Sequence, residues 1–204
     1  DEKKSEQQLY ESEPEEETVE EVKEINLGVA SFDSINPILS NNKNIQDISK
    51  IIFEPLMTLT SDYKLENCLA KEWAKQSDTE YIIKLQEGIK WSDGQDFTAE
   101  DVKFTIDRLK DTTSIYNSNV QNVIQVEIVD DVTIKITLNQ EVPFFEYNLT
   151  FPILSSKYYS DKEFIADIVP VGTGMYKVSE VKDTSLILTK NEYYKNSDNL
   201  KLEK

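Results

Sequence analysis

The amino-acid sequence predicts a mixed α/β fold of the α+β kind, because hairpins and single helices alternate without strict β–α–β order. Apolar and polar residues alternate on both sides of Asp130-Asp131, which predicts a β-hairpin over residues 126–138. Apolar residues spaced by three and four predict helices at residues 45–56 and after Thr98. With 204 residues, of which 38% are hydrophobic, the chain can bury a core.

A strand and a helix are the first elements that the pattern predicts. Residues 25–30 alternate between apolar and polar side chains, and a polar stretch follows them. Pro55 is expected to end the helix that comes next. The apolar face of this helix consists of Ile45, Ile48, Ile52 and Leu56.

A second strand and helix are predicted between residues 78 and 109. Gly88 and the Asp93-Gly94 pair end a strand whose alternation begins near residue 80. Thr98 is placed to cap the following helix, and Asp101 stands three residues later, as in a capping box. The inward face of the strand is predicted to be Tyr81, Ile83 and Leu85, and that of the helix Val102, Ile106 and Leu109.

Two more strands are predicted near the end of the chain, over residues 176–181 and 186–188. They follow Gly172-Thr173-Gly174, which lacks the Lys-Ser/Thr pair of a phosphate loop and is interpreted as a tight turn. Five aromatic residues in apolar contexts are expected in the core: Trp73, Trp91, Phe104, Phe144 and Phe145.

Residues 1–24 differ from the rest of the chain. They hold 11 acidic and 3 basic residues, a net charge of −8, and almost no apolar side chains. Such a segment repels itself and buries nothing, so we expect a disordered acidic tether. The alternative is a tail that binds a cation or a partner.

Composition excludes several functions. The net charge of −17 argues against nucleic acid or an anionic membrane surface as the main partner. The chain has no histidine, which excludes His-based triads and His-ligated metal sites. Cys68 is the single cysteine and is expected to be an inert, partly buried thiol. Asp93, Asp130 and Asp131 stand in turn contexts, where aspartate is locally favoured, so catalysis by them is not expected.

The order of these elements resembles one family closely. Residues 81–102 read YIIKLQEGIKWSDGQDFTAEDV and match, almost position for position, a signature of the family 5 extracellular solute-binding proteins. These are the oligopeptide- and dipeptide-binding receptors of ABC importers. Ser34-Ile35-Asn36-Pro37 and residues 169–176 resemble its earlier and later markers. Two departures are Pro55, where glycine is common, and Met175, where proline is common.

The resemblance implies a domain organisation. Residues 25–204 are similar to the N-terminal portion of a periplasmic-binding-protein-like type II lobe. The main lobe would begin at residue 25, a small subdomain would be inserted over about 55–165, and the chain would return to the main lobe over about 166–204. Family chains are more than twice as long, so a second lobe is expected outside these residues.

The resemblance also implies a function. The protein would be an extracytoplasmic receptor, a lipid-anchored or periplasmic monomer that binds peptides and delivers them to an ABC permease, without a cofactor or a resident metal. Within the family the solute could instead be a nickel chelate, haem, a sugar or a pheromone peptide. An Asp- or Ser-dependent hydrolase and a structural surface domain are the rivals from other classes. The ligand-binding residues implied are Ser40, Asn41, Asn42, Lys43, Asn44, Gly172, Thr173 and Gly174.

Overall fold

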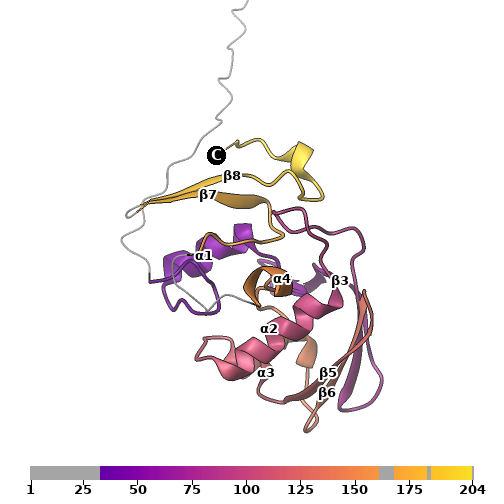
Figure 1. Ribbon diagram of the computed structural model, residues 1–204. Coiled ribbons are helices and arrows are strands. Elements are labelled where there is room, and N and C mark those ends of the chain that lie inside the picture. The colour runs from indigo at the N-terminus through magenta and orange to yellow at the C-terminus, as the bar shows by residue number, and fades with distance from the viewer. Residues whose placement is uncertain (1–32, 161–167, 183–184, 204) are drawn as a thin grey trace, which may run out of the picture.

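The computed structural model describes residues 33–160, 168–182 and 185–203. The expected tether and the expected strand at 25–30 lie outside these ranges. Within them, single helices alternate with antiparallel strands, without strict β–α–β order (Figure 1). The predicted fold class is therefore confirmed.

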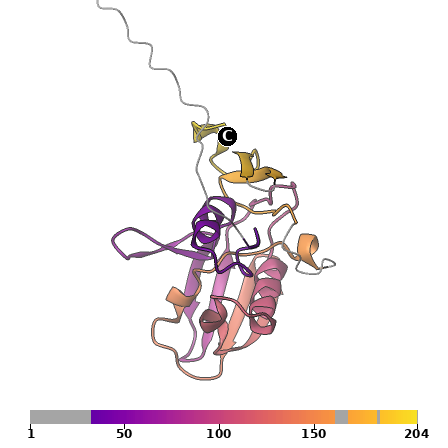
Figure 2. The same cartoon turned by 90° about the vertical axis from the view of Figure 1, so that its left-hand side faces the viewer.

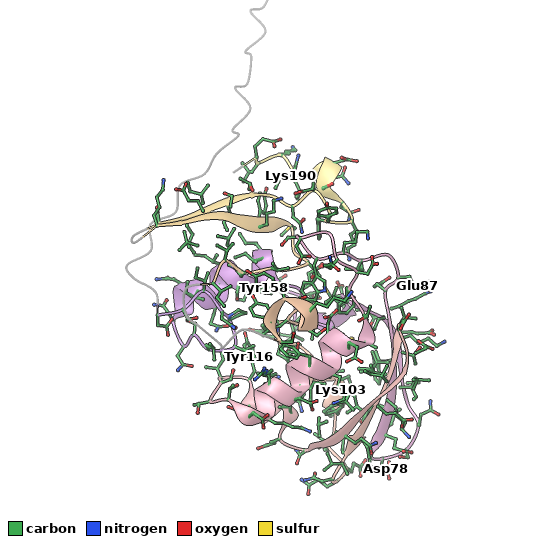
Figure 3. The ribbon with its side chains drawn as sticks, viewed as in Figure 1. Asp78, Glu87, Lys103, Tyr116, Tyr158 and Lys190 are labelled. Carbon is green, nitrogen blue, oxygen red and sulfur yellow. The ribbon has the colours of Figure 1, made fainter. Side chains whose placement is uncertain are left out.

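A four-stranded antiparallel sheet with one long helix on its face forms the largest unit. Figure 2 shows the helix, α2, lying against the sheet. Asp78 and Glu87 lie at the two ends of β4, on the outside of the molecule (Figure 3). The strands, in their order across the sheet, are β3 (Ala70–Lys75), β4 (Glu80–Leu85), β6 (Thr133–Leu138) and β5 (Val123–Asp130), and the helix is α2 (Ala99–Asp111).

The predicted hairpin is the pair of strands β5 and β6. Val126 pairs with Ile136 and Ile128 with Ile134, so the apolar positions of both strands share one face. The Asp130 carboxylate accepts a 2.9 Å hydrogen bond from the Val132 N–H, which explains the aspartate by turn geometry. The residues of β4 and α2 that the sequence predicts to face inward are all buried: Tyr81, Ile83, Leu85, Val102, Ile106 and Leu109.

The start of α2 is the capping box that the sequence predicts, and Asp101 does more than close it. One carboxylate oxygen accepts hydrogen bonds from the Thr98 N–H at 2.8 Å and the Trp91 Nε1–H at 3.1 Å. The other accepts from the N–H and hydroxyl of Ser156 at 2.7 and 2.8 Å. Asp101 is only 2% exposed, so these four donors compensate a buried carboxylate.

The helix α1 (Lys43–Ile52) is shorter than predicted. It stops at Ile52 and Phe53 is already extended. Glu54, directly before Pro55, is held out of the helical region, so the helix has to end before it. Leu56, predicted as the last residue of the helical face, is buried but lies outside the helix. The chain continues instead into a short hairpin of β1 (Met57–Leu59) and β2 (Leu65–Asn67).

The remaining elements complete the core. The predicted last strands pair as an antiparallel hairpin that lies beside α1 (Figure 1). Trp91 and Phe145 are buried and Trp73 and Phe104 are partly buried, as predicted, but Phe144 is 73% exposed. Its backbone is left-handed, with a φ of +57°. These elements are α3 (Asn117–Val120), η1 (Phe145–Asn148), α4 (Ser156–Tyr159), β7 (Tyr176–Lys182), β8 (Ser185–Lys190) and η2 (Ser197–Asn199).

Candidate functional site

The predicted binding stretch, residues 40–44, lies in a loop that leads into the first turn of α1. Ser40 is 1% exposed and its hydroxyl donates a hydrogen bond to the Asp33 carboxylate. The same hydroxyl accepts a 3.1 Å bond from the Asn42 N–H. Asp33 also accepts from the Asn41 N–H at 3.2 Å. Ser40 therefore holds the loop together and is withdrawn from the surface.

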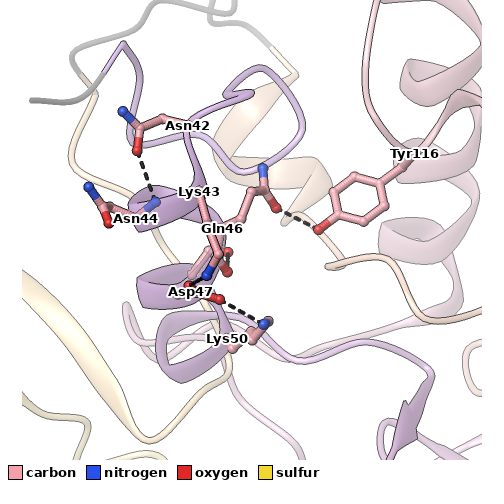
Figure 4. A network of polar contacts seen from close by, with 8 residues as sticks. Asn42, Lys43, Asn44, Gln46, Asp47, Lys50 and Tyr116 are labelled. Atoms are coloured by element: carbon pink, nitrogen blue, oxygen red, sulfur yellow. Dashed lines mark hydrogen bonds and ion pairs between the residues drawn. The ribbon is translucent and has the colours of Figure 1, made fainter.

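The side chains of two other predicted residues, Asn42 and Lys43, make polar contacts with groups of α1 (Figure 4). Asn42 is the N-cap, and its side-chain oxygen accepts a 2.9 Å bond from the Asn44 N–H. Lys43 lies 2.8 Å from the Asp47 carboxylate, which Lys50 also contacts at 2.9 Å. Hydrogen bonds from these two ammonium groups lower the pKa of Asp47 to about 2. Lys43 is nevertheless solvent-exposed, so its ammonium can turn to a ligand.

Asn41 and Asn44 present their side-chain amides to solvent. Within the part of the chain that the structure describes, neither amide group makes a hydrogen bond. Because an amide offers two donors and an acceptor, this pair matches the alternating polar groups of a peptide backbone. These two residues are therefore the members of the polar stretch whose side-chain amides are available on the surface.

Gln46, which sequence reasoning missed, fixes the position of this loop. Its Nε2 donates 2.7 Å hydrogen bonds to the carbonyl oxygens of Pro37 and Ser40. Its Oε1 accepts a 2.6 Å bond from the hydroxyl of Tyr116, which comes from the segment between α2 and α3 (Figure 4). No local pattern signals this role, because Tyr116 is 70 positions away in the sequence.

The predicted turn at residues 172–174 packs against the other end of α1. A Cβ built on Gly172 would lie 1.9 Å from the carbonyl oxygen of Ile52, and one on Gly174 would lie 2.5 Å from that of Ile51. The Gly174 N–H also donates a 2.8 Å bond to the Ile52 carbonyl. Neither glycine has a positive φ. Close approach of two main chains, and not a left-handed turn, is thus the reason for both glycines.

The structure does not bring the two halves of the predicted site together. Residues 40–44 lie at the N-terminal end of α1, and residues 172–174 cover its C-terminal end. A helix of 10 residues is about 15 Å long. A ligand would have to extend along the helix to contact both halves.

A buried carboxyl lies beside the second half. Burial raises the pKa of Glu54, while Lys195, 3.9 Å away, acts in the opposite direction. Burial and the neighbouring Glu54 raise the pKa of the Cys68 thiol to about 12. Cys68 is therefore a poor nucleophile at neutral pH, in agreement with the predicted inert thiol. Among the described residues, no group of three or more His, Cys, Asp or Glu side chains could hold a metal ion.

Comparison with known proteins identifies the family. The profile of the bacterial extracellular solute-binding proteins, family 5 Middle, matches residues 64–204. The chain belongs to this family. The glutathione-binding protein GsiB of Escherichia coli (strain K12) is 32% identical to this family 5 chain over 179 residues, which cover 82% of the chain and 34% of GsiB.

Solved structures agree with this assignment. AppA from Clostridium difficile, a candidate peptide-binding protein, is 31% identical, with a TM-score of 0.64 over 72% of this chain and 33% of that one. NikZ from Campylobacter jejuni, solved with Ni(L-His), is 26% identical, with a TM-score of 0.72 over 84% and 35%. The murein tripeptide-binding protein MppA, at 19% identity and a TM-score of 0.74, shares the fold.

The fold is thus that of a type II periplasmic-binding-protein-like lobe, as predicted. The chain spans about a third of the length of the relatives that it matches. Those relatives are solute-binding proteins and not enzymes, and the family is extracytoplasmic. Over the described ranges, no helix combines the length and the apolar character needed to cross a bilayer.

Proposed function

We propose that the whole protein is the receptor of an ABC importer and binds a peptide or a peptide-like solute. The observation that carries this proposal is the 32% identity to a glutathione-binding protein over 82% of the chain. The 31% identity to AppA, a candidate peptide-binding protein, points to the same class of solute. Delivery to a membrane permease, attachment through a lipid anchor before residue 1 and a monomeric state belong to the proposal.

The proposed domain organisation follows from the same family. Residues 55–165 form the small subdomain, and residues 166–204 return to the main lobe. A second lobe closes over the solute by a hinge motion. The acidic residues 1–24 act as a spacer between the binding domain and the membrane.

The proposed contacts are made to the main chain of the ligand, so they tolerate many different ligand side chains. The amides of Asn41 and Asn44 bind peptide N–H and C=O groups, and Lys43 turns from Asp47 to a ligand carboxylate. The segment 172–174 lines the far end of an extended ligand. Ser40 and Asn42 shape the loop, because their side chains are already hydrogen-bonded.

Isothermal titration calorimetry tests this function on the whole protein, with glutathione and with trialanine as ligands. We expect binding of at least one of them, weakened about tenfold or more when Asn41 and Asn44 are both changed to alanine. Asn199→Ala, which removes an exposed amide elsewhere, is the matched control. An unchanged affinity in the double variant would remove these amides from the site. No binding of any peptide would remove the proposed class of solute.

Two alternatives are decided by related measurements. The likeness to NikZ in its complex with Ni(L-His) favours a nickel chelate as the second candidate solute. Titration of the whole protein with Ni²⁺ and L-histidine together tests it. A second measurement tests whether the protein lacks enzymatic activity. Peptides incubated with the protein should be recovered intact by mass spectrometry, and cleavage products would support a hydrolase.

A further inference from the structure

An open groove lies away from the predicted solute site. It has a volume of about 460 Å³ and runs between the β1–β2 hairpin, β3 and η1. Figure 2 shows the hairpin, in purple, projecting from the body of the molecule. None of the residues 40–44 or 172–174 lines the groove. The residues that line this groove therefore need an explanation of their own.

The walls of the groove include three aromatic side chains: Tyr63, Trp73 and Tyr147. Tyr63 is 82% exposed and has a φ of +62°. The left-handed conformation costs a residue with a side chain about 1–2 kcal/mol of free energy. Because the ring of Tyr63 is exposed, burial of the ring does not offset this cost. Phe144, also left-handed and 73% exposed, packs edge-on against Tyr147 at 6.3 Å. Two strained turns thus hold exposed aromatic rings beside one groove.

The charge of the groove is unbalanced. Glu146 is half-buried in the lining, and its carboxylate has no hydrogen bond or ion pair with any residue in the described ranges. The one cation in the lining, Lys64, is 2.6 Å from the carboxylate of Asp62. Asn67 donates its amide N–H to the Lys71 carbonyl at 2.8 Å, which leaves its side-chain oxygen as an acceptor.

We infer that this groove binds a lysine or arginine side chain of a partner polypeptide. An aromatic face attracts a cation through its quadrupole, and the Glu146 carboxylate supplies the opposite charge. A half-buried carboxylate gains most from such a partner, because water screens it less than a fully exposed one.

The openness of the groove favours a polypeptide over a small cation. Leu59, which is 45% exposed on β1, and Phe144 add apolar surface beside it. A core rich in aromatic and apolar side chains is the usual composition of a polypeptide contact. The net charge of −17 favours approach of a basic segment over long range.

Calorimetry on the whole protein tests this inference with a blocked peptide, acetyl-Gly-Lys-Leu-Lys-Gly-amide, and its counterpart with Gln in place of Lys. We expect the lysine peptide to bind about tenfold more tightly than the glutamine peptide. Glu146→Gln and Tyr63→Asn should each weaken binding of the lysine peptide about fivefold or more. Asparagine tolerates the left-handed conformation at position 63, so this variant keeps the turn and loses only the ring.

Glu66→Gln is the matched control, because it removes the same charge as Glu146→Gln. Glu66 lies on β2 between Leu65 and Asn67 but does not line the groove. This control variant should leave the affinity unchanged. Equal affinity for the two peptides overturns the inference. Binding that neither groove variant weakens places the peptide elsewhere, for example in the solute cleft, and also overturns it. Binding of tetramethylammonium without binding of the lysine peptide replaces the polypeptide with a small cation and rejects the proposed partner.

Discussion

The hydroxyl of Tyr116 donates a 2.6 Å hydrogen bond to the side-chain oxygen of Gln46 (Figure 4). Through this bond the segment after α2 holds the loop that carries Asn41 and the first turn of α1, which carries Asn44. Gln46 passes the restraint on through its two bonds to the carbonyls of Pro37 and Ser40. The candidate site is therefore supported by a residue that lies outside the predicted binding stretch.

Tyr116→Phe should destabilise the protein by about 1–2 kcal/mol, because the partly buried oxygen of Gln46 loses its donor. Urea unfolding measures the loss. Tyr63→Phe is the control, since the Tyr63 side chain is 82% exposed and its hydroxyl reaches water. Amide hydrogen exchange should also quicken in residues 38–44 of the Tyr116 variant. Equal midpoints for the two variants would show that the bond adds nothing to stability.

Asp101→Asn should cost about 3 kcal/mol or more. The asparagine side chain keeps one acceptor oxygen but turns an NH₂ group toward donors that the carboxylate now accepts from. Thr98→Ala, which affects only the cap of α2, should cost about 1 kcal/mol. Urea midpoints of both variants provide the comparison. A smaller loss for Asp101→Asn than for Thr98→Ala would contradict the role of Asp101 as a buried centre of four hydrogen bonds.

Gly172→Ala should destabilise the protein by several kcal/mol, about 3 or more, because the new Cβ would lie 1.9 Å from the Ile52 carbonyl oxygen. Gly88→Ala separates this steric effect from backbone strain. Gly88 has a φ of +72° and nothing within 4 Å of its Cβ position, so its substitution should cost only about 1 kcal/mol. Thermal unfolding of both variants measures the difference. Similar losses would mean that the segment can move off α1 without cost.

The pKa of Glu54 is raised, chiefly by burial, and this sets a direction for pH dependence. A raised folded-state pKa means that the folded protein binds this proton more tightly than the unfolded chain does. Its stabilising contribution is complete below the unfolded value of 4.5 and is lost as the pH rises through the folded value. Glu54→Gln, which mimics the protonated form, should thus be more stable than the natural protein at about pH 7.

The difference between the two proteins should shrink as the pH falls toward about 4. Urea unfolding at a series of pH values measures it, with the exposed Glu66→Gln as the control. A gap that grows toward acid would reverse the assigned sign. A constant gap would mean that the carboxyl does not titrate differently in the folded and unfolded states.

Local sequence determined the elements whose signals lie within a few residues of one another. The alternation around Asp130-Asp131 specified the β5–β6 hairpin, because side chains on a strand point to opposite faces in turn. Thr98 and Asp101 marked the start of α2, since a helix terminus is satisfied by its immediate neighbours. The order of such motifs over residues 25–204 also pointed to the family.

Only the tertiary structure decided which polar groups are free. Ser40 and Asn44 are short polar residues four positions apart, yet Asp33 engages the first while the second faces solvent from the first turn of α1. Gln46 meets Tyr116, Gly172 meets Ile52, and Glu146 and Trp73 line the same groove. Each pair joins residues far apart in the chain, and no periodicity encodes such a meeting. It follows from the packing of whole elements, whose free energy is a sum over many contacts that no single segment contains.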